Sequence, residues 1–373
     1  MNRYLVYLVT LNMLANIVSQ VSLLLFEDRF NGSVSSILLS IPIGAVAMIV
    51  FVKLFDRFPN QGLSEIVGGA LPRWIGAPFL LLQAFLWFVC GSVILLYIAE
   101  VAKRFMNPDF APAEALVLFL IVVVLFANMP SNRILYMLEI IMLLSVPFIA
   151  FIIGKAIFSD SLLVSSMMEV ATHALDMPSL MSFCASMFMY SGFMCLCVFN
   201  RVISPKPKRM WYLSALMLTG SITLLITFFL PIGFHGADGI LEWTYPWFVT
   251  ADSLRLQYGF IERVLFFFLL LYVLISVISV IVYWHIGLDL LKSSMPRFRS
   301  SWLKVVVPYC ALAAISLASI YIDLNVGLRF LRTIARIWML VQLPNTLLVL
   351  AVLAGAAYLR TRRQRRGTRD ESI

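Results

Sequence analysis

The sequence predicts an all-α polytopic membrane protein. Long apolar runs recur along the chain, among them Tyr4–Phe26, Val34–Phe55, Trp74–Ala99 and Ile261–Leu291. A helix needs roughly 20 residues to cross a hydrocarbon core about 30 Å thick, and each of these runs is long enough. The composition agrees, since 62% of the residues are hydrophobic and only 13% are charged, and the mean hydropathy is +0.96. These values exclude a soluble globular domain of this length.

The apolar stretches predict ten transmembrane helices. The expected spans are residues 4–26, 34–55, 74–100, 112–129, 134–158, 180–200, 211–234, 261–291, 302–322 and 334–359. The loops between them are too short for a separate folded domain. We therefore expect a single transmembrane domain over residues 1–359 and a basic cytoplasmic tail over residues 360–373. The first span is too long, and its flank too weakly charged, for a cleavable signal peptide.

Basic residues predict the orientation, because loops rich in Lys and Arg remain in the cytoplasm. Ten crossings with both termini in the cytoplasm put the tail and the loops after the sixth and eighth spans on that side. The basic residues of the two loops are Arg201, Lys206, Lys208, Arg209, Lys292, Arg297, Arg299 and Lys304. Three arginines contradict the pattern by lying on the outer side, namely Arg329, Arg332 and Arg336.

The net charge of +9 is therefore mainly a matter of topology. We expect the tail to contact anionic membrane lipid, with roughly 1 kcal/mol of attraction per basic residue, rather than nucleic acid. All five cysteines fall within apolar spans, and the three histidines are too scattered for a zinc site. The chain also lacks a Gly-rich phosphate loop and a nucleophile with a nearby base. We expect no metal, no cofactor and no enzymatic activity.

Ten crossings divide into two sets of five that start from opposite faces of the membrane. This layout predicts a 5+5 inverted repeat, the plan of many secondary transporters, with helices one and six discontinuous. Unwound backbone survives in a membrane only where it is buried in protein or lines a polar cavity. In span six, Tyr190, Ser191 and Gly192 mark the expected break. The alternative is that Ser191 and Gly192 simply allow close helix packing.

Span one contains Asn12, Asn16, Ser19 and Gln20 but no Gly or Pro. Such side chains are costly in a membrane unless they are paired or solvated, so they either line a cavity or join helices by hydrogen bonds. Among the ionisable residues, Glu139 early in span five is the candidate for a proton-linked or gating role. The alternative for Glu139 is a structural ion pair, for instance with Arg133.

Four stretches give the chain a resemblance to the endospore germination permeases, the B subunits of nutrient germinant receptors. They are LFDRFPNQGLSEI at 54–66, NRILYMLEIIMLL at 132–144, FMYSGFMCLCVFNRVISPKPK at 188–208, and the region from Tyr245-Pro246 to Ile261-Glu262-Arg263. Each motif alone is weak, whereas their order and spacing together are specific. The likeness covers nearly the whole chain.

The resemblance implies a fold similar to amino-acid permeases of the LeuT/APC type. In that fold a ligand binds between the broken helices one and six, backed by helices three and eight. Carried over by position, the pocket would use Asn16, Ser19, Tyr190, Ser191 and Gly192. Two departures concern the ligand class: span one lacks the glycines of many relatives, and Met194 stands where a more polar residue is common.

The resemblance also implies the function of a nutrient sensor in the spore inner membrane. The protein would bind a small germinant, with an amino acid as the expected class. It would signal to an A-type membrane subunit and a C-type lipoprotein subunit. The alternative is a proton-coupled amino-acid transporter, and uptake of ligand by the protein alone distinguishes the two.

Overall fold

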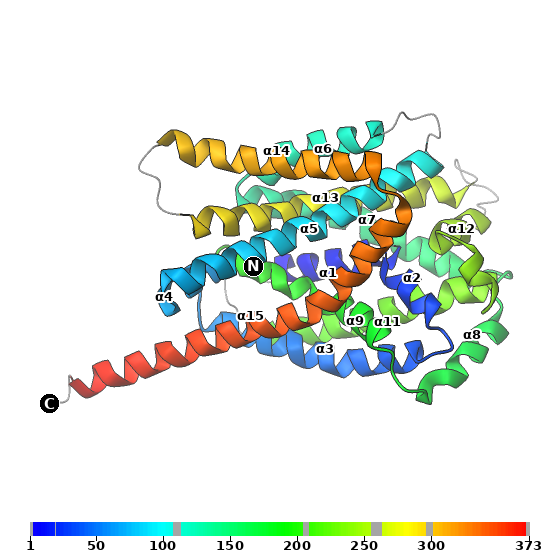
Figure 1. Cartoon of the computed structure of the whole chain (residues 1–373). Coiled ribbons are helices and arrows are strands. Elements are labelled where there is room, and N and C mark those ends of the chain that lie inside the picture. Colours follow the sequence, from blue (N-terminus) through cyan, green and yellow to red (C-terminus); the bar gives the residue numbers. More distant parts are fainter. Residues whose placement is uncertain are drawn as a thin grey trace.

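The computed structural model describes residues 3–18, 20–106, 113–203, 209–254, 263–295 and 301–370, which form helices joined by short connections (Figure 1). In chain order the elements are α1 (Arg3–Ile17), α2 (Gln20–Glu27), α3 (Ser33–Asp56), α4 (Leu63–Ala70), α5 (Arg73–Phe105), α6 (Glu114–Ala127), α7 (Ser131–Ile157), α8 (Val164–Ala171), η1 (Thr172–Leu175), α9 (Leu180–Tyr190), η2 (Ser191–Cys195), α10 (Leu196–Phe199), α11 (Arg209–His235), η3 (Gly239–Glu242), α12 (Pro246–Ser253), α13 (Val264–Ser294), α14 (Ser301–Asn325) and α15 (Leu328–Asp370). The symbol η marks a 3₁₀ helix.

Each predicted span coincides with a helix or with a run of consecutive helices. Within the described residues, eight helices are long and apolar enough to cross a membrane, counting α9 to α10 as one, and the pair α1–α2 raises the number to nine. The remaining predicted span, 112–129, corresponds to α6, which has 14 residues. At 1.5 Å per residue α6 is about 21 Å long, which is less than the hydrocarbon thickness. The chain is a polytopic helical membrane protein, and the count of ten crossings stays a prediction.

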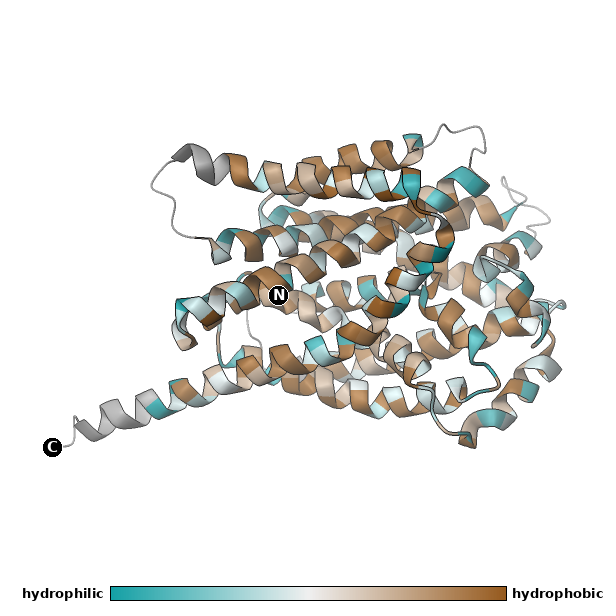
Figure 2. Ribbon diagram, viewed as in Figure 1, coloured by the Kyte–Doolittle hydropathy of each residue, from teal (hydrophilic) through white to brown (hydrophobic). Residues whose placement is uncertain are grey.

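The outer surface of the bundle is apolar. Large hydrophobic side chains such as Val46, Phe85, Leu125 and Ile140 are more than half exposed. Figure 2 shows hydrophobic residues along the bodies of the long helices and hydrophilic residues concentrated near their ends. An exposed apolar belt of this size would aggregate in water, so it faces lipid.

The two ends of the bundle differ in what they contain. We call the end where α15 runs out toward the C-terminus the tail end; α3 and α13 also finish there, and α4 lies beside them (Figure 1). We call the opposite end the far end, where α2 finishes and α15 begins. The short elements α8, η1, η3 and α12 lie at the far end, because they connect helices that end and begin there.

The centre of the bundle is the span built from α9, η2 and α10. Within that span 94% of an 18-residue stretch is buried, against 17% for α14. α1 packs on η2 and α9, while α5 and α13 pack against each other more extensively than any other pair. Gly91 of α5 lies against the ring of Trp284, and Gly287 of α13 lies against Phe88. This close pairing of α5 and α13 forms one wall of the central region.

Candidate functional site

The first and sixth predicted spans both change direction or helix type inside the bundle. α1 and α2 meet at an angle of 53°. α9 gives way to the 3₁₀ helix η2 at Ser191 and then to the short α10. A change of helix type leaves backbone carbonyls without their usual N–H partners, and in a membrane these must be satisfied by other groups.

The side chain of Asn12 satisfies the carbonyls at the end of α9. Its amide nitrogen donates to the carbonyl of Phe188 at 2.8 Å and to that of Met189 at 3.1 Å. The hydroxyl of Ser191 also donates to the Phe188 carbonyl, at 2.7 Å. A polar side chain from span one therefore caps the end of α9, where span six changes to a 3₁₀ helix.

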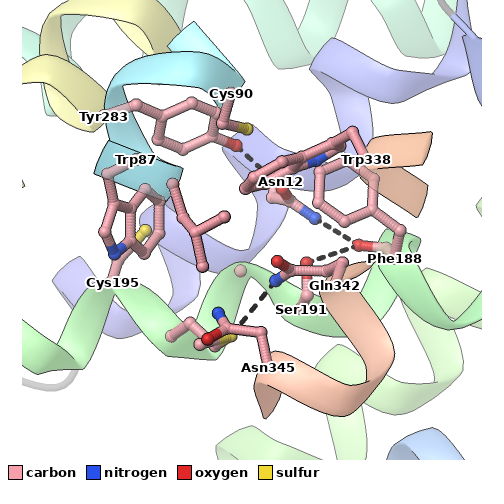
Figure 3. A pocket seen from close by; sticks show the side chains of 13 residues that line it. Asn12, Trp87, Cys90, Phe188, Ser191, Cys195, Tyr283, Trp338, Gln342 and Asn345 are labelled. Carbon is pink, nitrogen blue, oxygen red and sulfur yellow. Dashed lines mark hydrogen bonds between the residues drawn. The ribbon is translucent and has the colours of Figure 1, made fainter. Parts of the chain in front are cut away.

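The side chain of Asn12 also accepts a hydrogen bond from another helix, α13. The hydroxyl of Tyr283 in α13 donates to Asn12 Oδ1 at 2.8 Å. One turn along α1, Asn16 Nδ2 donates to the backbone carbonyl of Asn12 at 2.6 Å. Asn12 thus joins α1, α9 and α13 in the middle of the bundle, as the dashed lines in Figure 3 show in part.

A cavity lies beside this junction (Figure 3). Its walls come from α1, α5, α9, η2, α13 and α15, and the lining residues are Asn12, Leu86, Trp87, Cys90, Phe188, Ser191, Gly192, Met194, Cys195, Tyr283, Trp338, Gln342 and Asn345. None of these carries a formal charge at neutral pH. The centre of a water-sized sphere has only about 10 Å³ in which to move, which is room for about one water. The cavity is therefore small and uncharged, with amide and hydroxyl groups set among apolar side chains.

The wall from α15 was missed by the sequence analysis, which expected backing only from spans three and eight. Gln342 Nε2 and Thr346 Oγ1 donate to the sulfur of Met194 at 3.2 and 3.3 Å. Asn345 Oδ1 accepts a hydrogen bond from Gln83 Nε2 of α5 at 2.6 Å. A signal existed in the sequence, since these polar residues surround Pro344 in the middle of an apolar span, where a proline removes a backbone donor.

The structure brings only part of the predicted pocket together. Ser191 and Gly192 line the cavity, while Tyr190 and Asn16 do not, and Ser19 lies outside the described residues. The ring of Tyr190 packs toward Gly44 and Gly220, and its hydroxyl lies 3.3 Å from Ser221 Oγ. Tyr190 therefore faces α3 and α11. The chief polar residue of the junction is Asn12, which the site prediction omitted.

Gly192 is held tightly against α1. A Cβ at this position would lie 2.8 Å from the Cα of Val9, 2.9 Å from the Cβ of Asn12 and 3.1 Å from the carbonyl oxygen of Leu8. Two of these three atoms belong to the backbone, which cannot turn aside as a long side chain can. Glycine at this position lets η2 and α1 touch, which supports the close-packing alternative.

Glu139 lies near the tail end, away from the cavity. Its carboxylate forms an ion pair with Arg3 at 3.1 Å and accepts a hydrogen bond from the Tyr4 hydroxyl at 3.1 Å. Both partners belong to the first turn of α1. The structural partner of Glu139 is thus Arg3, and naming Arg133 for that role was wrong. A proton-linked role for Glu139 stays a prediction.

A charged cluster centred on Arg201 lies at the tail end, just beyond α10. The Arg201 guanidinium donates to both carboxylate oxygens of Asp289 at 2.8 Å, and it approaches Glu65 at 2.8 Å and Ser64 Oγ at 2.6 Å. Burial lowers the pKa of Arg201, but the hydrogen bond and charge of Asp289 and the charge of Glu65 outweigh it, so the net pKa is raised. Arg201 is therefore a permanent cation.

Two of the four stretches that carried the family resemblance meet in this cluster. Glu65 and Ser64 belong to the stretch 54–66, and Arg201 belongs to 188–208. The neighbouring Asn200 adds two bonds, from its Nδ2 to the carbonyls of Phe58 at 2.9 Å and Gln61 at 2.8 Å. The end of α10 is thereby fastened to α13 and to the segment between α3 and α4.

We expect Arg201→Gln to lower the free energy of unfolding by about 2 kcal/mol. Breaking a fully buried ion pair costs about 3–5 kcal/mol, and partial exposure of Arg201, Asp289 and Glu65 reduces this through solvent screening. The measurement is an SDS-unfolding titration of the purified protein in mixed micelles. Arg57→Gln is the control, because Arg57 is exposed at the same end; equal losses for the two variants would contradict a structural role for the cluster.

Fold and site together define a class of protein. The chain is an integral membrane protein whose long helices surround a small uncharged cavity beside a central span that changes helix type, an arrangement that fits a permease-like protein. Comparison with protein families agrees, because residues 28–326 match the family described as spore germination protein. The chain therefore belongs to this family of spore germination permeases, which is not a family of enzymes. No curated protein matches the chain.

Proposed function

We propose that this protein is the nutrient-sensing B subunit of a spore germinant receptor and that its ligand, a small amino acid, binds in the cavity beside Asn12. The observation that carries the proposal is a buried, uncharged cavity with amide and hydroxyl groups in its wall, beside the span of a germination permease that changes helix type. Amide groups from Asn12, Gln342 and Asn345 and the hydroxyl of Ser191 supply both donors and acceptors. Such groups suit a small zwitterion that needs orientation without net charge compensation.

A further donor at the cavity has no partner. The indole N–H of Trp338 is buried and makes no hydrogen bond within the described part of the chain, and Trp338 lines the cavity. A buried donor without an acceptor is unfavourable by about 1–3 kcal/mol. A ligand carboxylate or carbonyl oxygen beside Trp338 would remove that penalty.

The size of the cavity links binding to signalling. Room for about one water excludes an amino acid, so a ligand can bind only a state in which the walls have moved apart. A ligand that binds one state and not the other shifts the equilibrium toward that state by RT ln(1 + L/Kd), where L is the free ligand concentration. Movement of α9–α10 would then be transmitted to membrane-facing contacts with an A-type subunit and a C-type lipoprotein subunit.

We infer the finer topology on the same basis. It consists of ten crossings in two inverted sets of five, with α1–α2 and α9–α10 as the interrupted members, and with both termini in the cytoplasm. The membrane would be the spore inner membrane. The bend of 53° between α1 and α2 and the change of helix type at Ser191 support this arrangement.

Thermal unfolding in detergent across a panel of amino acids and sugars tests the proposal. A ligand at about 100 times its Kd stabilises the protein by about 2.7 kcal/mol. We expect one class of ligand to raise the Tm of the wild-type protein and of Thr346→Val, but not of Gln342→Met. The two variants are matched, because both residues donate to the Met194 sulfur and only Gln342 lines the cavity.

Uptake measurements separate the receptor from the alternative. Binding without accumulation of ligand in vesicles that contain this protein alone supports a receptor, whereas accumulation driven by a proton gradient supports the transporter. A ligand response that survives in Gln342→Met would contradict binding in this cavity.

A further inference from the structure

A second cavity lies at the far end of the bundle, where α2 finishes and α15 begins. It is lined by Gln20, Leu23, Leu24, Phe26, Glu27, Ile240, Leu241, Trp243, Thr244, Arg332 and Arg336. The centre of a water-sized sphere has about 90 Å³ to move in, against about 10 Å³ in the central cavity. Two of the three arginines that contradicted the charge pattern of the sequence line this space.

The lining carries an excess positive charge. Arg336 forms an ion pair with Glu27, so Arg332 is the lining arginine for which the described residues supply no ion-pair partner. Other basic residues at this end have acidic partners, since Arg29 pairs with Asp238 at 3.1 Å and Lys103 with Asp323 at 2.8 Å. Within the described ranges Arg332 has no ion pair of this kind.

Polar atoms around the cavity are buried without hydrogen bonds. Among the described residues, no hydrogen-bond partner is found for Gln20 Nε2 or Arg332 Nε. Gln20 is only 4% exposed and lines the cavity. Tyr97, beyond the cavity wall, interacts with Arg332 and with Glu100. Both unpartnered atoms of the lining are donors, so the group that would satisfy them is an acceptor.

From this arrangement we infer a second binding site at the far end, specific for a small monocarboxylate. One negative charge neutralises the lining, and the two oxygens of a carboxylate match the donors of Arg332 and Gln20. Leu241 and Trp243 offer an apolar wall for the rest of the molecule. Phosphate carries a charge nearer −2 and has no apolar part, so it fits this lining less well than a monocarboxylate does. This site is separate from the central cavity, and the inference does not require the proposed function.

The test is a titration of the purified full-length protein with potassium propionate, followed by Tm and by tryptophan fluorescence. Propionamide at the same concentration is the uncharged isostere, and potassium phosphate and potassium chloride control for anion type and ionic strength. We expect propionate to bind and propionamide to have no effect. A response to phosphate alone would indicate a phosphate or lipid-headgroup site, and a response to every salt would indicate screening only. Either result overturns the inference.

Variants locate the binding. Arg332→Gln should weaken propionate binding by at least about thirtyfold, because it removes a partly desolvated charge partner. Gln20→Met should weaken it about tenfold and should fold normally, since the Gln20 amide nitrogen makes no hydrogen bond to lose. Arg329→Gln is the matched control, one turn earlier on α15, exposed and outside the cavity lining. Unchanged binding in both Arg332→Gln and Gln20→Met would overturn the inference.

Failure of this inference is distinguishable from failure of the proposed function. Loss of propionate binding in Gln342→Met but not in Arg332→Gln would place propionate in the central cavity, and the far-end site would be wrong. Propionate binding that depends on Arg332, together with no response to any germinant, would leave the far-end site standing and count against the central one.

Discussion

Replacing Asn12 by leucine is expected to lower the free energy of unfolding by about 3 kcal/mol. The Tyr283 hydroxyl loses its acceptor and the Met189 carbonyl loses a donor, and each buried group left unsatisfied costs about 1–3 kcal/mol. The Phe188 carbonyl still accepts a hydrogen bond from the Ser191 hydroxyl, so the free-energy cost at this carbonyl is smaller. SDS unfolding in mixed micelles measures the effect, and the ligand response found for the wild type should disappear.

A double-mutant cycle separates the free energy of the hydrogen bond between Asn12 and Tyr283 from a general disruption of α1. Tyr283→Phe alone should cost about 1 kcal/mol, in line with interhelical hydrogen bonds in membranes. Asn12→Leu combined with Tyr283→Phe should cost less than the sum of the two, because the second change removes a group already unsatisfied. Strict additivity would show that Asn12 and Tyr283 do not act together, contrary to their 2.8 Å hydrogen bond.

Gly192→Ala is expected to lower the free energy of unfolding by about 3 kcal/mol, at the upper end of the range for overpacking. The added Cβ would lie 2.8 Å from the Cα of Val9, so α1 and η2 must move apart. Because that movement also shifts Asn12, the capping bonds to Phe188 and Met189 weaken. The measurement is the same unfolding titration, together with ligand affinity.

Gly154→Ala provides the matched control. Gly154 lies in α7, and a Cβ built there meets nothing within 4 Å. Alanine is the better helix former by about 1 kcal/mol, so this variant should be neutral or more stable. If Gly192→Ala proved as harmless as Gly154→Ala, the contact between η2 and α1 would be looser than the distances indicate.

The positions of the helices could be predicted closely from the sequence. The expected spans 34–55 and 211–234 differ from α3 and α11 by at most two residues at either end. This accuracy has a simple cause, since the length of an apolar run is a local property that one bilayer thickness selects. The last span is the exception, because α15 runs from Leu328 to Asp370 where the sequence predicts 334–359.

The candidate site could be predicted only in part. Ser191 and Gly192 were found because a hydroxyl and a glycine in mid-span are unusual in any membrane helix. Asn12 and Asn16 are the same residue type one turn apart on α1, so the sequence could not decide which of them lines the cavity. Exposure does not distinguish them either, because both are almost fully buried. The contribution of α15 was missed because Gln342 and Asn345 are distant in sequence from Ser191 and Gly192, with which they line the cavity.

The sequence by itself determined that this chain is a polytopic helical membrane protein of the spore germination permease family, because hydropathy and motif order need no knowledge of packing. Only the tertiary structure decided which of the scattered polar residues meet. The rotation of each helix about its axis follows from side-chain packing with its neighbours, and that packing brings Asn12 of α1, Tyr283 of α13 and the end of α9 to one point. It also places Arg332 and Gln20 in the wall of one cavity at the far end, whereas the sequence alone shows Arg332 only as an exception to the positive-inside pattern.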